Sequence, residues 1–199
     1  MLKIGITGGI GSGKTTVCQF FELFGIPVYY ADPRAKALMT EDAALVEQVK
    51  TIFGEAAYLP DGSLNRKHIA GIAFQDKSRL ALLNAAVHPA VARDGERWNA
   101  EQSDAPYTLK EAALLFESGS YEQLDKIITI FAPRELRLQR VLQRDQSDRA
   151  DVEARMDQQM PEEEKLRLAD YVIHNDGQKL LLPQVVAVHR QLLALSAAT

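Results

Sequence analysis

Gly8-Gly9-Ile10-Gly11-Ser12-Gly13-Lys14-Thr15, close to the amino terminus, is the stretch that decides the fold. It fits the phosphate-binding pattern G-x-x-x-x-G-K-[ST], in which glycines let the backbone bend until successive N–H groups face phosphate oxygens. A buried apolar run from Leu2 to Thr7 precedes it, and an amphipathic helical pattern follows it. This strand–loop–helix context is what phosphate binding requires. We therefore predict a functional P-loop rather than a glycine-rich turn that binds nothing.

Each part of this loop has an expected role. The helix that starts near Lys14 adds its first N–H groups and the positive end of its dipole to the anion site. Lys14 is expected to reach the β- and γ-phosphates and to act in catalysis, and the hydroxyl of Thr15 to ligate Mg²⁺. ATP and Mg²⁺ are thus the predicted cofactors. The residues expected to contact the nucleotide here are Gly9, Ile10, Gly11, Ser12, Gly13, Lys14, Thr15 and Thr16.

Short apolar, β-branched runs alternate with longer helical patterns along the rest of the chain. They predict five strands, at Leu2–Thr7, Ile26–Tyr30, Tyr107–Leu109 with an extension towards Leu115, Lys126–Phe131 and Tyr171–His174. Strands separated by helices need crossover connections, which produce parallel pairing. The predicted fold class is therefore α/β, with a five-stranded parallel sheet and flanking helices.

Two amphipathic helices are expected to cover this sheet. The first follows the P-loop and ends at Gly25, and its apolar stripe consists of Val17, Phe20, Phe21 and Phe24. The second lies at the carboxyl end, and its stripe consists of Leu181, Val185, Val188, Leu192 and Leu195. Cys18, one turn beyond Lys14, is expected to be a small buried side chain that packs on the sheet.

The stretch between the second and third strands, from about Pro33 to Pro106, is too long for a simple crossover and is mostly helical in pattern. We interpret it as an inserted helical substrate domain of about 33–105, within a core of about 1–32 and 106–199. A second unusual stretch, from Arg144 to Glu164, is dense in charge and has few large apolar residues. We expect it to form a mobile surface element.

Composition and charge argue against several classes of protein. The 199 residues carry a formal net charge of −4, whereas a general nucleic-acid binder needs clustered Lys and Arg. No apolar run is long enough to span a bilayer, and the amino terminus lacks the pattern of a signal peptide. One cysteine allows no intrachain disulfide, which fits a reducing compartment. We expect a cytoplasmic protein with no nucleic-acid, membrane or obligatory protein partner.

Asp32 follows the second predicted strand directly. In an open parallel sheet, ligands bind at the carboxyl ends of the strands. If this strand lies beside the P-loop strand, Asp32 comes close to the γ-phosphate and can accept the proton of an attacking hydroxyl. The alternative is an N-cap, because Asp32-Pro33 is a good helix start. The two interpretations are compatible, and position alone does not choose between them.

Further motifs along the chain resemble those of one family. They are Ala31-Asp32, Asp61-Gly62-Ser63-Leu64-Asn65-Arg66, His88-Pro89, Leu114-Leu115-Phe116-Glu117, Gln143-Arg144-Asp145, Ala169-Asp170 and Asn175. Together with the segment from Gly5 to Thr16, they make the chain resemble the dephospho-coenzyme A kinases nearly from end to end. A P-loop of this sequence followed by Leu-Leu-Phe-Glu is much more specific than a P-loop alone.

The resemblance implies the fold of nucleotide and small-metabolite kinases, with a parallel-sheet core, a helical substrate domain and a lid at about 134–165. It implies ATP-dependent phosphorylation of the ribose 3′-hydroxyl of dephospho-CoA, giving CoA and ADP, the last step of coenzyme A biosynthesis. Asp32 would contact this hydroxyl as the general base or orient it. Arg66 and His88 would belong to the acceptor-binding region, and Glu117 would support the site or cap the segment after the third strand.

Three arginines after Pro133 share one face of a predicted helix, because Arg137, Arg140 and Arg144 are spaced i, i+3, i+7. Such a face can clamp phosphates, or it can be a solvated face paired with acids such as Glu135. The resemblance supports Arg140 as a catalytic residue and Arg144 as a nucleotide contact. Arg137 stands where the family often has Gln, so it is left out of the predicted site.

Asn175 follows the last predicted strand, where the resemblance would place the adenine. Its side-chain amide can donate to and accept from a base edge. The alternative is a simple turn, since Asn175-Asp176-Gly177 is a turn-forming sequence.

Two positions depart from the family pattern. Tyr30 stands where an acid is common, and Glu111-Ala112-Ala113 stands where acid-x-Pro is common. Glu111 keeps a carboxylate that could hold Mg²⁺ through water. Neither change removes a group that the chemistry needs.

Two other functions compete with this one. One is another P-loop small-molecule kinase, acting on a sugar acid or a nucleoside monophosphate. The other is a P-loop module that senses or hydrolyses ATP, but the sequence offers no water-positioning group or switch segment for it.

Overall fold

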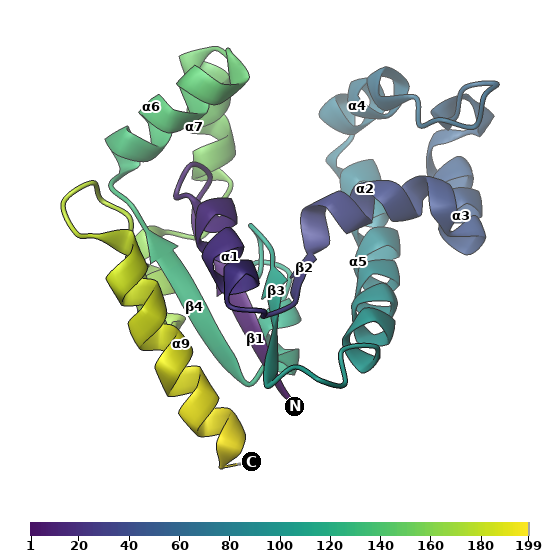
Figure 1. The fold of residues 1–199 in the computed structure, drawn as a ribbon. Coiled ribbons are helices and arrows are strands. Elements are labelled where there is room, and N and C mark those ends of the chain that lie inside the picture. Colours follow the sequence, from purple (N-terminus) through teal and green to yellow (C-terminus); the bar gives the residue numbers. More distant parts are fainter. Residues whose placement is uncertain (199) are drawn as a thin grey trace. The chain divides into compact units, whose positions relative to one another are not determined.

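The computed structural model describes residues 1–198, apart from the side chains of Phe74 and Lys77. The chain separates into two compact units. One is an α/β unit made of Met1–Tyr30 and Asn99–Thr199, and the other is a helical unit, Ala31–Trp98 (Figure 1).

The strands of the α/β unit follow the predicted runs closely. They are β1 (Leu2–Thr7), β2 (Val28–Tyr30), β3 (Tyr107–Glu111), β4 (Lys126–Phe131) and β5 (Tyr171–His174). Its helices are α1 (Lys14–Leu23), the short 3₁₀ helix η2 (Ser120–Gln123), α6 (Arg134–Asp145), α7 (Arg149–Asp157), α8 (Glu162–Leu168) and α9 (Leu181–Ala197).

All five strands are parallel, in the order β2-β3-β1-β4-β5, which confirms the predicted fold class. The expectation that the second strand could lie beside the P-loop strand is wrong, because β3 lies between β2 and β1. The register pairs Ile6 of β1 and Tyr30 of β2 with the same residue, Glu111 of β3. The three strands therefore end at one edge of the sheet, where the P-loop begins.

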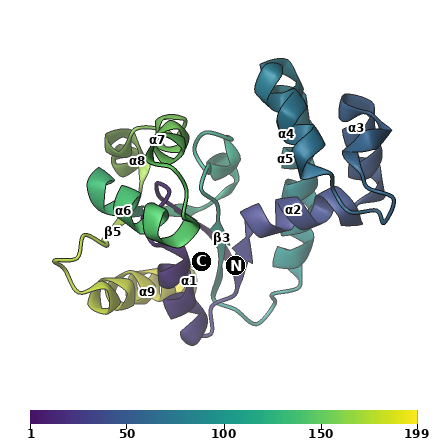
Figure 2. The ribbon, with the colours of Figure 1, turned by 90° about the horizontal axis from the view of Figure 1, so that it is seen from above.

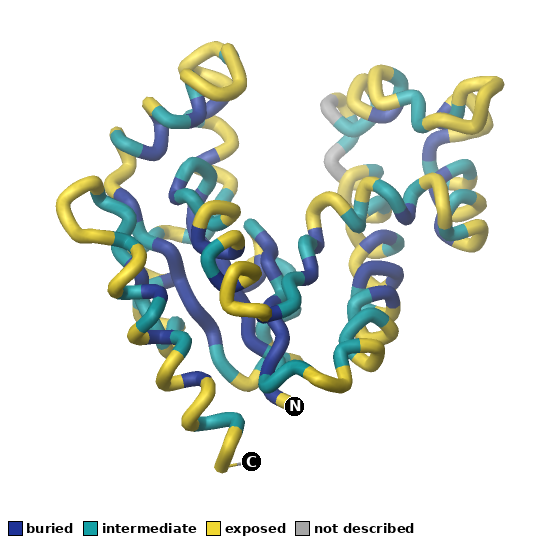
Figure 3. Tube along the Cα trace, in the orientation of Figure 1, coloured by how far each residue is buried: buried dark blue, intermediate teal, exposed yellow. Residues whose placement is uncertain are grey.

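Alternation along the strands gives the sheet two different faces. On one face, Ile4, Ile6, Ile128 and Ile130 form the main core with the apolar stripes of α1 and α9. These two helices lie side by side in Figure 2, and Figure 3 shows how continuously the strands are buried. Thr129 faces the other way, and its hydroxyl donates to the backbone oxygen of Lys165 in α8 at 3.5 Å.

The predicted stripes pack on the sheet except at Phe24, which is the C-cap of α1 and is exposed. Val17, Phe21 and Cys18 of α1 are fully buried, and burial raises the pKa of the Cys18 thiol. Cys18 is thus a core residue. Gly25 ends the helix with a positive φ of 78°, and its N–H donates to the backbone oxygen of Glu22 at 2.9 Å.

The charge-dense stretch expected at the surface forms α7 and part of α8, and it carries its own apolar contacts. Val152 and Met156 are buried in a small cluster with Leu138 and Val141 of α6. Most residues of the stretch are exposed, as predicted, and these two apolar residues at i and i+4 anchor α7 to α6. Its mobility stays a prediction.

The helical unit contains α2 (Ala31–Glu41), α3 (Ala43–Phe53), the 3₁₀ helix η1 (Glu55–Ala57), α4 (Arg66–Gln75) and α5 (Lys77–Ala100). Asp42 and Asn65 are the N-caps of α3 and α4. Arg34 of α2 donates to both carboxylate oxygens of Asp94 in α5, at 2.9 and 3.0 Å, and this ties the two helices together. No helix in the described part of the chain is long and apolar enough to cross a membrane.

Candidate active site

The P-loop connects β1 to α1. Gly13, the N-cap of α1, has φ 90° and ψ 28°, a left-handed conformation that glycine adopts without strain. The helix begins at Lys14, so the hydroxyls of Thr15 and Thr16 stand exposed in its first turn. The side-chain amine of Lys14 folds back along the loop and donates to the backbone oxygen of Gly8 at 3.0 Å.

Neighbouring segments pack tightly on the loop at its glycines. At Gly11, with φ 80°, a Cβ atom would collide with the backbone of Arg137. At Gly13 it would collide with the side-chain amide of Asn175. At Gly9 it would overlap the Arg137 guanidinium and lie 2.6 Å from Glu162 Oε1. The loop is therefore held in place from outside, by α6, α8 and the end of β5.

Glu111, at the end of β3, lies close to the P-loop lysine. Its side chain is 8% exposed, and its Oε1 lies 3.9 Å from Lys14 Nζ. Opposite charges at this distance attract each other, which holds the carboxylate beside the ammonium. The carboxylate that the sequence pointed to thus lies beside the phosphate-binding lysine.

Arg140 and Asn175 come together at the same part of the loop. Arg140 donates to the backbone oxygen of Asn175 at 3.1 Å, and a longer contact of 3.5 Å reaches the backbone oxygen of Gly11. The side-chain amide of Asn175 donates to the backbone oxygen of Ser12 at 2.8 Å. Asn175 is therefore more than a turn residue, because its side chain ties the last strand to the P-loop.

Arg144 behaves differently, although it shares the helix α6. Its side chain is 65% exposed, and it bonds the adjacent Asp145 at 2.6 Å. The structure thus places Arg140 at the loop and leaves Arg144 in solvent.

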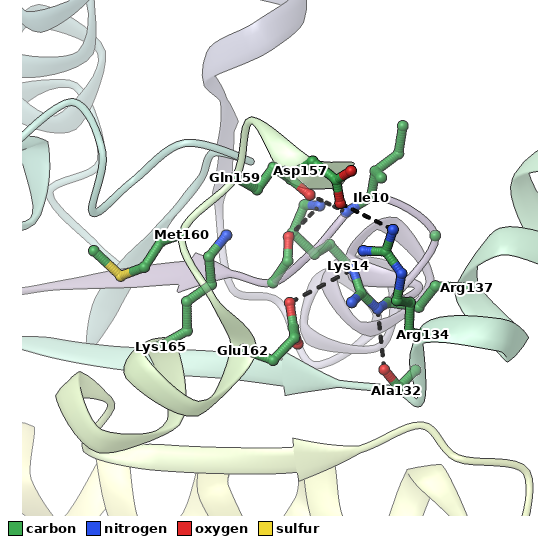
Figure 4. A network of polar contacts seen from close by, with 12 residues as sticks. Ile10, Lys14, Ala132, Arg134, Arg137, Asp157, Gln159, Met160, Glu162 and Lys165 are labelled. Carbon is green, nitrogen blue, oxygen red and sulfur yellow. Dashed lines mark hydrogen bonds and ion pairs between the residues drawn. The ribbon is translucent and has the colours of Figure 1, made fainter. Parts of the chain in front are cut away.

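Arg137, which was left out of the predicted site, lies against the loop. Its guanidinium is buried, donates to the backbone oxygen of Ala132 at 3.0 Å and lies 3.5 Å from Glu162 Oε1 (Figure 4). Burial lowers the pKa of Arg137 and raises that of Glu162, and each charge partly offsets the effect on the other.

The segment after α7 makes further contacts that the sequence did not predict. The side-chain oxygen of Gln159 accepts the backbone N–H of Ile10 in the P-loop at 2.8 Å. Next to it, the backbone N–H of Met160 donates to Glu117 at 2.7 Å. The fully buried amine of Lys165 lies 3.0 Å from the same carboxylate, as an ion pair whose angles fall outside hydrogen-bond geometry. Glu117 therefore binds the segment between α7 and α8 and does not act as a cap of the segment after β3.

The remaining predicted site residues belong to the helical unit. Asp32 lies in the first turn of α2, which begins one residue earlier, so the N-cap interpretation is wrong. Arg66 is the first residue of α4, and His88 lies within α5. All three side chains are exposed.

A P-loop between the central strand and the first helix of a five-stranded parallel sheet, with basic side chains gathered around it, defines the class of P-loop kinases. The model of the dephospho-CoA kinase family matches residues 2–180. The chain therefore belongs to the dephospho-CoA kinase family, whose ATP-dependent members act in coenzyme A biosynthesis.

Individual relatives agree with this assignment. The chain is 42% identical to the dephospho-CoA kinase of Salinibacter ruber over 179 residues, which cover 89% of this chain and 90% of that protein. It is 35% identical to that of Bacteroides fragilis over 185 residues, 93% of this chain and 90% of that protein. The solved structure of the enzyme from Campylobacter jejuni superposes with a TM-score of 0.71 at 28% identity, covering 96% of this chain and 97% of that one.

Proposed function

We propose that this chain transfers the terminal phosphate of ATP to the ribose 3′-hydroxyl of dephospho-CoA. The predicted residues of the α/β unit bind ATP, and those of the helical unit bind the acceptor. The observation that carries the proposal is the P-loop itself, with Lys14 folded along it and Arg140 beside it, in a chain that matches the family over residues 2–180.

On the nucleotide side, the backbone N–H groups from Gly9 to Thr16 bind the phosphates, and Lys14 neutralises charge on the β- and γ-phosphates. Arg140 is close enough to the loop to stabilise the transferring phosphoryl group. Arg144 and Asn175 contact parts of the nucleotide that lie farther from the terminal phosphate. For Asn175 this is supported by its place at Gly13, and for Arg144 by its exposed position on the same helix.

The residues near the loop fit a magnesium ion. Mg²⁺ prefers oxygen ligands and is usually held by one or two protein groups together with phosphate oxygens and water. Thr15 offers an exposed hydroxyl, and Glu111 a carboxylate that can act through water. Within residues 1–198 no cluster of three or more His, Cys, Asp or Glu side chains is placed to hold a metal, which suits such a sparsely ligated ion. When bound, Mg²⁺ would neutralise charge on the phosphates.

On the acceptor side, Asp32 accepts the proton of the 3′-hydroxyl, or orients the hydroxyl for attack. The sheet supports this role, because β2 ends at the same edge as β1 and Asp32 follows two residues later. Arg66 and His88 bind dephospho-CoA. The segment 134–165 acts as a lid that keeps water from the phosphoryl group, since a kinase that admits water wastes ATP.

A panel of acceptors tests this function. ADP release is measured by a coupled assay with dephospho-CoA, a sugar acid, a nucleoside monophosphate and no acceptor. We expect turnover with dephospho-CoA far above all the others. Turnover with another acceptor but not with dephospho-CoA would contradict the proposal, and so would equal ADP release without any acceptor.

A further inference from the structure

Gln159 reaches the phosphate-binding loop from the segment between α7 and α8. Its side-chain Oε1 accepts the N–H of Ile10 at 2.8 Å. Since a backbone N–H requires an acceptor, this bond fixes the amide orientation, and the Nε2 group must point elsewhere with two protons to donate. Within the described residues, no hydrogen-bond acceptor meets that group. The Gln159 amide is thus fixed on the loop, and its two Nε2 protons are available to donate to a ligand.

Buried charge fixes the backbone that carries this amide. Met160, the next residue, donates its N–H to Glu117, and Glu117 is held by the fully buried Lys165. Three residues after Gln159, the Glu162 carboxylate lies against Gly9 and pairs with the buried Arg137. Figure 4 shows Gln159, Glu162 and Arg137 close to the loop. An exposed glutamine on a free segment would lose side-chain entropy on binding a ligand, whereas this one is ordered in advance.

The position of Gln159 along the loop indicates which phosphate it faces. In a P-loop, the backbone N–H groups take the α- and β-phosphates, and the lysine reaches the β- and γ-phosphates. Here Lys14 Nζ lies at the backbone oxygen of Gly8, two residues before Ile10. The Gly8–Ile10 end of the loop is therefore the end at which the terminal phosphate lies.

We propose that Gln159 is a direct contact of the terminal phosphate: its Oε1 stays on the N–H of Ile10 while its Nε2 donates to a γ-phosphate oxygen. Glu117 and Lys165 are positioning residues that act through Gln159. The proposal rests on the ATP-binding half of the proposed function and is independent of the identity of the acceptor.

The test compares Gln159→Glu with the unmodified chain and with Gln158→Glu, which adds the same charge at the exposed neighbouring residue. Binding of Mg²⁺-AMPPNP and of Mg²⁺-ADP is measured by titration calorimetry. Glutamate keeps an acceptor for Ile10 but turns the donor into a negative oxygen. Because hydrogen bonds to charged groups are among the stronger ones, we expect Gln159→Glu to bind AMPPNP at least about tenfold more weakly and ADP within about threefold of the unmodified chain. Gln158→Glu should leave both affinities unchanged.

Other outcomes would overturn the proposal. Equal weakening for AMPPNP and ADP would mean that Gln159 only shapes the loop, and no weakening would mean that it makes no contact. Tighter binding of AMPPNP by Gln159→Met would mean that the amide blocks the loop. If the unmodified chain bound neither nucleotide, the proposed function would fail as well. If it discriminated as expected but did not phosphorylate dephospho-CoA, only the acceptor would be wrong.

Lys165→Met separates positioning from a merely structural role. Methionine fills the buried space without the charge, and Glu117, which is 20% exposed, keeps access to water. If Lys165 acts through Gln159, the substitution weakens AMPPNP binding in the unmodified chain and adds nothing in the Gln159→Met background. Equal losses in both backgrounds would contradict the positioning role.

Discussion

The proposed site residues have different surroundings in the two units of this kinase. In the α/β unit, most of the side chains at the P-loop already have partners: Lys14 bonds Gly8, Arg140 bonds Asn175, and Gln159 bonds Ile10. In the helical unit, the side chains of Asp32, Arg66 and His88 are exposed, and they make no hydrogen bond within the described residues of that unit. The side chains around the P-loop are thus held in advance by packing, whereas the residues proposed to bind the acceptor lie exposed on the surface of helices.

This difference separates two kinds of mutational effect. A change on the nucleotide side should alter nucleotide binding, and often stability, because it breaks contacts that already exist. A change at a residue proposed to bind the acceptor should alter acceptor binding or turnover, and should leave nucleotide binding and stability unchanged. Two predictions test this separation, and two more test the contacts within the α/β unit.

Asp32→Asn is expected to have the largest effect. Replacing a general base by its amide should lower kcat by about 10²- to 10⁴-fold, while AMPPNP affinity and thermal stability stay unchanged. Steady-state kinetics and calorimetry on the same preparation measure these quantities. Undiminished transfer would show that Asp32 is not the base, and reduced AMPPNP binding would break the separation between the two sides.

Lys14→Met should lower both transfer and binding. The ammonium neutralises phosphate charge in the ground state and in the transition state, so kcat/KM should fall by about 10²- to 10³-fold and AMPPNP affinity should fall with it. Lys110, which lies on β3 outside the loop, is the control position as Lys110→Met. A variant that lost turnover at full AMPPNP affinity would place Lys14 in the same category as Asp32.

Comparing Arg137→Gln with Arg144→Gln tests how burial changes the effect on stability of losing an arginine from α6. Removing Arg137 leaves Glu162, which is 14% exposed, without its partner, and breaking a buried pair typically costs about 3 kcal/mol. Arg144 belongs to an exposed pair, so its loss should change the free energy of unfolding by less than about 1 kcal/mol. Denaturant unfolding of the two variants measures the contrast. Equal destabilisation would mean that the burial of Arg137 does not matter.

The smallest expected effect is on the pH dependence of stability. Burial raises the pKa of Glu162 above its value of about 4.3 in the unfolded chain, so the folded state binds this proton more tightly. Its contribution to stability is therefore fully present below about pH 4.3 and decreases as the pH rises through the folded-state pKa. Glu162→Gln should remove this decrease, so that the stability difference between the two proteins changes over this range and is constant above it. A difference that stayed constant from pH 4 upward would contradict the assignment.

Local features could be predicted from the sequence, whereas long-range contacts could not. The P-loop, three exact strands and the stripes of α1 and α9 follow from residue types at short spacing. The contact of Gln159 with Ile10 joins residues 149 positions apart, and no periodicity carries such information. The spacing of Arg137, Arg140 and Arg144 predicted one shared helix face. Their burial differs nevertheless, because only the first turns of α6 pack on the loop and on Glu162. For the same reason, strand order could not be read from the chain, and β3 separates β2 from β1.

The products of a single incubation test directly whether the protein phosphorylates the 3′-hydroxyl of dephospho-CoA. The protein is mixed with Mg²⁺-ATP and dephospho-CoA, and the products are quantified by mass spectrometry, with the site of the new phosphate located by ³¹P NMR. The proposed function predicts CoA and ADP in equal amounts, with the phosphate on the ribose 3′-oxygen. Inorganic phosphate in place of CoA, or a phosphate on any other oxygen of the acceptor, would contradict it.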